Sequence, residues 1–347
     1  MSDVIALGCG LVGKFVIKKL VERGLEVTVV DLKIADEIAK MDGVNPIEGD
    51  VFELIESLPK QKIAINMLPG RIGNEIRPKL LEAGHDIVDL AFTLEDPAQH
   101  LDLAQKNNSV LLWDVGIAPG LSNMLVKMAY DELENVDCVH IKVGGNPAQK
   151  DSEWSYMAPF SPSDVIEEYT RPARIVENSE TVIVPALSER HMIEVDNHGE
   201  MEAFLTDGLR SILDSFSANE MKEFTVRWPG HIDKWIEEGK YMQEQDLLQA
   251  WKFDDDKEEF TWLEVKANNA DSKLRWMVYD NGLNGDSSMA RTTGLVTAAC
   301  TILFVEKGPL NGCNLKPGIY APENLSGESV NFILDYLKQN GVEIKQS

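Results

Sequence analysis

The stretch VIALGCGLVGKFVIKKLVERGLEVTVVDLK, residues Val4–Lys33, decides how the first part of this chain folds. It opens on a short apolar run, Val4–Leu7, which has the length and composition of a buried strand. Three glycines in GxGxxG spacing follow: Gly8, Gly10 and Gly13. Apolar residues at helical spacing then run to Gly24, and a second apolar run ends at Asp31. The pattern predicts a strand, a tight glycine turn, a helix and a second strand within about 30 residues.

This order of elements is the context in which a GxGxxG turn binds a dinucleotide. Gly8 allows the tight turn, Gly10 lets a pyrophosphate approach the backbone, and Gly13 lets the helix pack closely on the strand. The first helical residues, Leu11 and Val12, offer backbone N–H groups and the positive end of the helix dipole to phosphates. The alternative interpretation is a glycine turn in an α/β domain that binds no nucleotide.

The acid at the end of the second apolar run bears on which dinucleotide binds. We expect Asp31 to accept hydrogen bonds from the adenosine ribose hydroxyls and to repel a 2′-phosphate. NAD is therefore favoured over NADP, although Lys33 lies close enough to attract a phosphate.

Further strands and helices alternate after this unit. Predicted strands are Asn45–Asp50, Lys62–Leu68, Asp86–Phe92 and Ser109–Val115, and predicted helices include Arg71–Glu82 and Pro97–Lys106. Alternating β and α elements with continuous apolar strands predict a Rossmann-type, doubly wound parallel sheet with both faces covered. The fold class is therefore α/β.

Polar residues gather where these strands end. In a doubly wound sheet, ligands bind beyond the carboxyl ends of the strands. On this basis Asp50 is expected near the adenine, and Leu68 and Pro69 near the nicotinamide ribose. Asp89 and Asp114, which lie at or near the ends of the last two strands, are expected to face the same crevice.

The strict alternation stops after Asn123, and a second domain is predicted there. Ser161 is expected to cap a helix that carries Pro162 at its first position. TVIVPA, EEFTWLEVKA and SKLRWMVYDN alternate like antiparallel strands, whereas Met201–Leu213 and His231–Tyr241 are interpreted as helical. The predicted division is a dinucleotide-binding domain, 1–120, an inserted α+β substrate and dimerisation domain, 121–288, and a C-terminal segment, 289–347, that returns to the first domain.

The composition limits the partners of the protein. The 58 acidic and 33 basic side chains give a net charge of −25, which argues against nucleic acid or an anionic membrane surface. The apolar run Gly294–Val305 is shorter than the ~20 residues of a membrane-spanning helix. Four scattered cysteines and the absence of a signal-peptide pattern indicate a reduced, cytoplasmic protein. No histidine, cysteine and carboxylate cluster has metal-ligand spacing, so no metal is predicted.

Several polar residues could carry chemistry. Those that could transfer a proton or hold an ammonium group are Asp89, Asp114, Glu168 and His231. Those that could grip a carboxylate through two N–H groups are Arg171, Arg174, Arg210 and Arg227. Tyr169 could either pack or donate a proton. Each residue also has a structural interpretation, as a loop cap, a surface ion pair or part of a helix terminus.

The chain resembles the saccharopine dehydrogenase-like reductases, and within them the lysine 6-dehydrogenase branch. The resemblance rests on GCGLVG, DVGIAPGLSNMLV, KVGGNP, FSPSDVIEEYTRPAR, EAFLTDGLR, VRWPGH and SMARTTG, and spans nearly the whole length. It implies a Rossmann domain with an inserted α+β domain, a homodimer or dimer of dimers, and an NAD-dependent dehydrogenase acting on a C–N bond of an amino acid.

Within that resemblance, lysine would be oxidised at its terminal amine to the semialdehyde, with release of ammonia. Asp114 would orient the ammonium group and help accept its proton, because nitrogen must donate its lone pair as hydride leaves. Asp89 or His231 would assist the attack of water, and Arg210 and Arg171 would hold the α-carboxylate. The alternatives are a saccharopine- or carboxyspermidine-type reductase, an NAD-dependent aminotransfer such as homospermidine synthesis, and a dinucleotide sensor without turnover.

Overall fold

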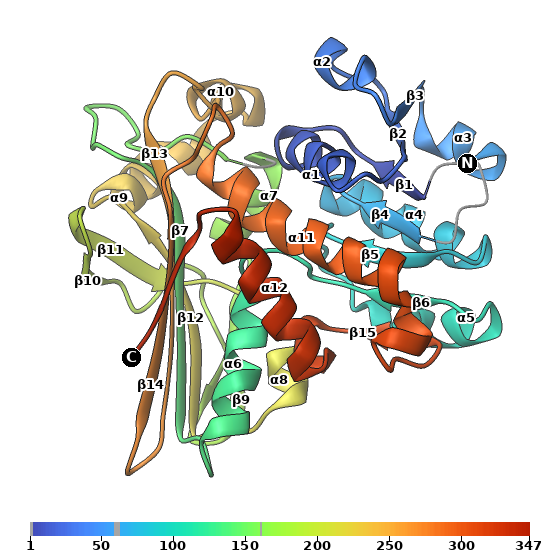
Figure 1. Cartoon of the computed structure of the whole chain (residues 1–347). Coiled ribbons are helices and arrows are strands. Elements are labelled where there is room, and N and C mark those ends of the chain that lie inside the picture. The colour runs from blue at the N-terminus through green and yellow to red at the C-terminus, as the bar shows by residue number, and fades with distance from the viewer. Residues whose placement is uncertain (1–2, 59–62, 160–161) are drawn as a thin grey trace. The chain divides into compact units, whose positions relative to one another are not determined.

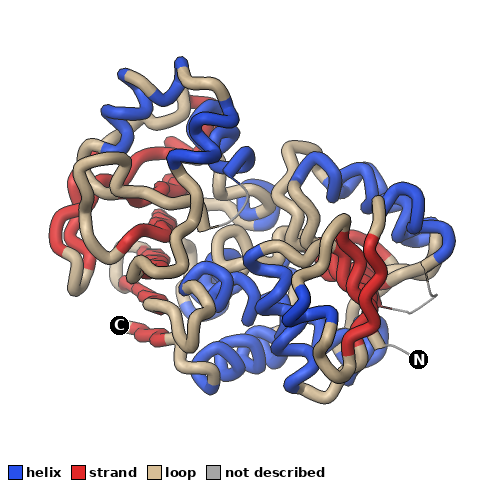
Figure 2. The backbone as a smooth tube through the Cα atoms, turned by 90° about the horizontal axis from the view of Figure 1, so that it is seen from above, coloured by secondary structure: helices blue, strands red, loops and turns tan. Residues whose placement is uncertain are grey.

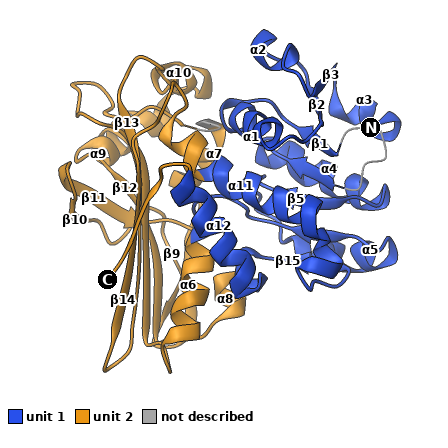
Figure 3. Cartoon of the chain, viewed as in Figure 1, with its two compact units in different colours: residues 1–121, 293–339 blue, residues 122–292, 340–347 orange. Residues whose placement is uncertain are grey.

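The structure is a computed structural model that describes residues 3–58, 63–159 and 162–347. It contains two compact units (Figure 3). Unit 1 comprises Met1–Leu121 and Thr293–Gln339, and unit 2 comprises Ser122–Thr292 and Asn340–Ser347. The position expected for the helix cap at Ser161 lies outside the described residues.

Unit 1 is built on a seven-stranded sheet in the order β15-β6-β5-β4-β1-β2-β3, and every pairing in it is parallel (Figure 1). The strands are β1 Val4–Leu7, β2 Val27–Asp31, β3 Val44–Glu48, β4 Ile63–Asn66, β5 Asp86–Asp89, β6 Val110–Leu112 and β15 Gly318–Tyr320. The predicted α/β class with a doubly wound parallel sheet is confirmed. The edge strand β15 comes from the C-terminal part of the chain and was not predicted.

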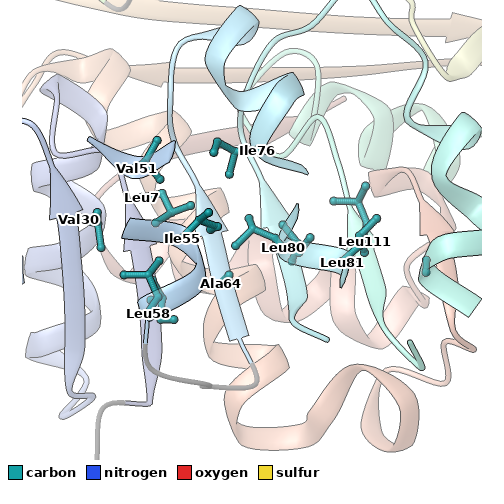
Figure 4. Packing of buried hydrophobic residues seen from close by; sticks show 13 residues of the cluster. Leu7, Val30, Val51, Ile55, Leu58, Ala64, Ile76, Leu80, Leu81 and Leu111 are labelled. Atoms are coloured by element: carbon teal, nitrogen blue, oxygen red, sulfur yellow. The ribbon is translucent and has the colours of Figure 1, made fainter. Parts of the chain in front are cut away.

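Helices lie on both sides of this sheet (Figure 2). They are α1 Leu11–Glu22, α2 Asp36–Ala39, α3 Val51–Leu54, α4 Gly70–Glu82, α5 Leu101–Lys106, α11 Ser288–Lys307, whose first turn belongs to unit 2, and α12 Gly327–Gln339. Apolar side chains from strands and helices fill the space between them, as Leu7, Ile76, Leu80 and Leu111 do in Figure 4. A side chain of this kind stabilises the fold by roughly 1.5–3 kcal/mol when fully buried.

Unit 2 contains a mixed sheet in the order β10-β11-β12-β7-β13-β14-β16, and β8 joins β12 to β9. Its strands are β7 Cys138–Pro147, β8 Ala173–Glu177, β9 Glu180–Val184, β10 His191–Val195, β11 Gly199–Leu205, β12 Glu220–Arg227, β13 Glu259–Asn268, β14 Lys273–Asp280 and β16 Glu343–Gln346. Its helices are α6 Leu121–Glu132, α7 Pro162–Thr170, α8 Ile212–Ser215, α9 His231–Glu237 and α10 Glu244–Ala250. The pairing of β7 with β12 is parallel, and the other pairings are antiparallel.

The structure differs from the sequence-based expectation at two places in unit 2. The prediction of a helix over Met201–Leu213 is wrong for its first part, which forms β11 and pairs with β10 and β12. The segment 289–347 also does not return wholly to the first domain. Asn340–Ser347 belong to unit 2, because β16 pairs with β14 through its backbone.

The helical run Ser288–Gly312 satisfies the length and hydropathy criteria for a membrane span. Its most apolar window is 89% buried within the chain, which is typical of the core helix of a folded domain. The run is therefore weak evidence for a membrane span.

Candidate functional site

The glycine turn of unit 1 has no space for a side chain at two of its glycines, which we call closed, and has space at the third, which we call open. A Cβ atom on Gly8 would lie 2.7 Å from the Met67 carbonyl oxygen, and one on Gly13 would lie 2.5 Å from the Gly8 carbonyl oxygen. A Cβ atom on Gly10 would meet nothing within 4 Å, and Gly10 is exposed. The turn therefore packs tightly against its strand and leaves a bare backbone surface at Gly10, which suits the approach of a pyrophosphate.

The start of α1 and the end of β2 complete this surface. Leu11 is exposed and Val12 half-buried in the first turn of α1, where backbone N–H groups have no helical partner. One carboxylate oxygen of Asp31 accepts a hydrogen bond from the backbone nitrogen of Cys9 at 2.5 Å. The other oxygen lies 3.4 Å from the backbone nitrogen of Lys33. Asp31 thus braces the turn and keeps acceptor capacity for ribose hydroxyls. These residues fit a bound dinucleotide.

The other residues expected to contact the cofactor, Leu68, Pro69 and Asp50, differ in exposure and in their contacts. Leu68 is half-buried against the unit 1 core, and Pro69 is exposed immediately before α4. Asp50 is exposed and caps α3, because its side chain accepts a hydrogen bond from the Phe52 nitrogen at 2.9 Å. The cap alone accounts for an acid at position 50.

The structure gives Asp89 a role other than activation of water. Its side chain is fully buried and forms an ion pair with the fully buried Arg77, with 2.7 Å between Oδ2 and Nε. The second oxygen, Oδ1, accepts hydrogen bonds from the Asn66 side chain at 3.2 Å and from the Ala91 nitrogen at 2.9 Å. Because both oxygens serve the joint between α4 and β5, Asp89 is corrected from a candidate base to a structural residue.

Asp114 lies two residues beyond β6, in a sharp turn. Its φ of 54° is left-handed, a conformation that aspartate tolerates better than most residues, and its side chain is 3% exposed. The following loop closes on itself through a hydrogen bond of 2.8 Å from the Leu121 nitrogen to the Gly116 carbonyl oxygen. The carboxyl group therefore does not point into bulk solvent.

In unit 2 a buried chain of hydrogen bonds joins three of the predicted site residues. The Arg227 Nε donates to the Tyr169 hydroxyl at 2.8 Å, and this hydroxyl lies 3.0 Å from His231 Nε2. His231 Nδ1 lies 2.9 Å from the carbonyl oxygen of Trp154, which can only accept. Nδ1 therefore carries the proton, and Tyr169 donates to Nε2. The Arg227 guanidinium also lies over the Tyr156 ring, 4.6 Å from its centroid.

This arrangement does not suit His231 as a base. Burial, together with the charge of Arg227, lowers the pKa of His231 from 6.5 to about 3. The imidazole is neutral at pH 7, and both ring nitrogens are already hydrogen-bonded. His231 is corrected from a candidate base to a residue that positions the Tyr169 hydroxyl.

A second chain of polar groups lies beside the first. Thr225 donates to Glu168 Oε1, the Thr206 and Thr225 hydroxyl oxygens lie 2.9 Å apart, and Thr206 lies 2.5 Å from Glu223 Oε2. These three contacts need three protons, and the two hydroxyls supply two. Burial, with the neighbouring acids Glu168 and Asp207, raises the pKa of Glu223 from 4.5 to about 8. A neutral Glu223 supplies the third proton.

The two chains meet at Glu168, whose Oε2 lies 3.6 Å from Arg227 Nη2. Glu168 was expected from the sequence, whereas Glu223, Thr206 and Thr225 were not. A signal was present, because three polar residues at period two, Glu223, Thr225 and Arg227, point to one face of a strand.

The remaining arginines are in different environments. Arg171 forms an ion pair with Glu167, one helical turn earlier, at 2.9 Å. Arg210 is 5% exposed and has a left-handed backbone, with φ of 52°. Arg174 binds both carboxylate oxygens of Asp207, at 2.8 and 2.9 Å.

One group of residues of metal-binding type was not apparent from spacing along the chain. Ligand atoms of Cys138, His140 and Glu220 lie within 4.8 Å of one another in unit 2. Spacing along the chain did not reveal this cluster, because Glu220 comes from a different strand.

Comparison with known proteins bears on both units. Residues 116–252 match the family model of the saccharopine dehydrogenase C-terminal domain. The fold is similar to that of an apo saccharopine dehydrogenase (L-Glu forming) from Saccharomyces cerevisiae, with a TM-score of 0.79, 18% identity and 100% of each chain covered. The segment 116–252 is therefore similar to the saccharopine dehydrogenase C-terminal domain, and the likeness of the whole chain to the yeast structure establishes its fold. These matches do not single out lysine 6-dehydrogenases.

Two other solved structures have a fold similar to that of this chain. An amine dehydrogenase from Mycobacterium smegmatis has a TM-score of 0.53 and 11% identity, with 94% of this chain and 96% of that chain covered. A DAP dehydrogenase from C. glutamicum in complex with DAP has a TM-score of 0.51 and 10% identity, with 95% and 96% covered. At these identities the likeness establishes the fold.

Proposed function

We propose that the protein is an NAD(P)-dependent dehydrogenase acting on a C–N bond of an amino acid, and that its substrate is L-lysine, oxidised at the terminal amine. The observation that carries the proposal is the glycine turn, closed at Gly8 and Gly13 and open at Gly10, on a chain whose second unit matches the saccharopine dehydrogenase C-terminal domain. A cytoplasmic homodimer, or a dimer of such dimers, is part of the same proposal.

The residues that would hold the dinucleotide are in unit 1. The backbone at Gly10, Leu11 and Val12 would bind the pyrophosphate, and Asp31 the adenosine ribose, which favours NAD over NADP. When bound, the cofactor supplies a hydride acceptor. The binding of an anionic pyrophosphate by a protein with a net charge of −25 depends on these local N–H groups.

In unit 2, Arg227 is the best-supported cation for the substrate carboxylate. Of its five N–H donors, one bonds to Tyr169, one to the Val226 carbonyl oxygen, and one points to Glu168 at 3.6 Å. The remaining donors can grip a carboxylate. Arg210 and Arg171 would assist at the same end of the substrate.

The reaction needs one proton acceptor near the amine. The terminal ammonium must lose a proton before hydride leaves its carbon, and we assign that step to Asp114. Water then adds to the carbon of the substrate iminium, and the carbon–nitrogen bond breaks to give the semialdehyde and ammonia. Asp89 and His231 are not available for the water step, because their polar atoms are engaged elsewhere.

The test is an assay of ammonia and NADH release from lysine and NAD. We expect the two products in equal amounts, and Asp114→Asn should lower kcat by roughly 10²-fold or more, the contribution of a general base. Unchanged turnover in Asp114→Asn would contradict the role of that residue, and NADH binding without turnover of any amine would indicate a sensor. Imine chemistry without accumulation of NADH would indicate aminotransfer.

A reductase that condenses an aldehyde with an amine is the nearest alternative. Its substrates carry more carboxylates and need more cations, but the fork of Arg174 is already bound to Asp207. Consumption of NAD(P)H with aldehyde–amine pairs, and equal damage from substituting Arg174 and Arg227, would favour that reaction over deamination.

A further inference from the structure

The sheet of unit 2 presents different chemistry on its two faces. Side chains alternate along β12, so Glu223, Thr225 and Arg227 face one side with the candidate substrate residues, and Glu220 faces the other. Glu220 lies in register with Cys138 at the start of the parallel strand β7. His140 is two residues further along β7 and so shares the face of Cys138.

These three side chains bring a thiol, an imidazole and a carboxylate together. The Cys138 Sγ lies 3.6 Å from Glu220 Oε1, and His140 Nε2 lies 2.6 Å from the same oxygen. Around a tetrahedral Zn²⁺ ion the expected separations are about 3.5 Å for sulfur to oxygen and about 3.3 Å for nitrogen to oxygen. The sulfur–oxygen distance already fits, and the imidazole must move from the carboxylate by less than about 1 Å.

The exposure of the cluster also suits an ion with an open coordination position. The His140 and Glu220 side chains are 32% and 36% exposed, and Cys138 is partly buried. A site of this kind is reached by an ion and by water, in contrast to the buried Glu223 on the opposite face.

The nearest cation, Lys222, is held by other acids. Its Nζ lies 2.9 Å from Glu189 and 3.1 Å from Glu177, and 3.6 Å from Glu220 Oε2. Three carboxylates therefore surround one ammonium group, and Glu220 is its most distant partner. Lys142, on the His140 side, is offset by the charge of Glu264. Because these carboxylates outnumber the two ammonium groups, the local charge favours a divalent cation.

We propose that Cys138, His140 and Glu220 bind a Zn²⁺ ion, with water as the fourth ligand. Thiolate and imidazole ligands together favour zinc over calcium or magnesium. The ion would join β7 to β12 at the point where both strands begin. This site is separate from the proposed dehydrogenase chemistry, and its test does not depend on activity.

The experiment is a Zn²⁺ titration of the full-length protein after treatment with a chelator. We expect saturable binding of one ion per chain and release of a proton, because the sulfur ligand is the thiolate. Co²⁺ in the same site should show a thiolate-to-metal charge-transfer absorption band. Both signals report on the unmutated protein.

Three variants assign the ligands: Cys138→Ser, His140→Asn and Glu220→Gln. Each substitution should weaken Zn²⁺ binding by at least about tenfold, because the loss of a group that only supports a metal ligand already weakens binding by about that factor. The matched controls Cys313→Ser and His100→Asn, both in unit 1, should bind Zn²⁺ as the unmodified protein does. Circular dichroism at each step checks that a variant has folded.

Some outcomes would overturn the proposal. One is the absence of saturable binding in the unmodified protein. Another is Zn²⁺ affinity that is equal in Cys138→Ser and in the Cys313→Ser control. A Co²⁺ complex without the thiolate band would have the same consequence, since it would place the ion away from Cys138.

Discussion

Glu223 shows how one buried carboxyl group can make stability depend on pH. Its pKa is raised from 4.5 to about 8 by burial and neighbouring acids. The folded protein therefore holds a proton that the unfolded chain releases above pH 4.5. The stability associated with that proton is complete below pH 4.5 and is lost as pH rises through about 8.

We expect Glu223→Gln to remove this loss. The amide can donate to Thr206 at any pH, so the variant should lose on the order of 3 kcal/mol less unfolding free energy than the unmodified protein between pH about 5 and about 8.5. Urea denaturation at a series of pH values measures the difference. The exposed Glu180→Gln is the control. Parallel pH profiles for all three proteins would show that Glu223 is ionised in the fold.

Substitutions at Gly13 and Gly10 separate the part that the glycine turn plays in folding from its part in cofactor binding. Gly13→Ala should destabilise the protein by about 1–3 kcal/mol, because the new methyl group would lie 2.5 Å from a backbone oxygen. Gly10→Ala should fold normally, because its Cβ meets nothing within 4 Å, yet should bind NAD at least about tenfold more weakly, because the methyl group fills the space left for the pyrophosphate.

Thermal unfolding and NAD titration distinguish the two effects. If Gly10→Ala bound NAD as tightly as the unmodified protein, the open glycine would not be the pyrophosphate site, and the cofactor assignment would be wrong.

At the scale of elements, the Arg77–Asp89 pair joins α4 to β5 inside unit 1. Asp89→Asn keeps the shape of the side chain but leaves the Arg77 charge without its partner, so it should destabilise the fold by about 3–5 kcal/mol. Chemical denaturation provides the measurement. A variant that unfolded normally but had lost turnover would instead restore Asp89 to a catalytic role.

At the scale of the whole molecule, the excess of acidic side chains should make stability sensitive to salt. With a net charge of −25, self-repulsion weakens the folded state, and salt shortens the range of that repulsion to about 3 Å near 1 M. We expect the melting temperature to rise by a few degrees between about 0.02 M and about 0.5 M NaCl. A melting temperature that fell over this range would show that ion pairs outweigh net repulsion.

The tertiary structure also explains how much of the fold could be predicted from the sequence. Apart from β15, the strands of unit 1 were visible in the sequence, because parallel strands buried on both faces appear as continuous apolar runs between helical patterns. In unit 2 the strand β11 was mistaken for a helix, because its five consecutive residues 201–205 are all buried and the two-residue alternation is lost. β16 was missed because its backbone pairing carries little sequence pattern.

By itself, the sequence determined the α/β class, the glycine turn with its acid at Asp31, and the resemblance to saccharopine dehydrogenases, because each depends on neighbours along the chain. Only the tertiary structure decided that Asp89 is paired with Arg77, that His231 stays neutral, and that Glu220 meets Cys138 and His140. Those properties depend on burial and on partners from distant segments, which bring together charges and ligands that no local pattern connects.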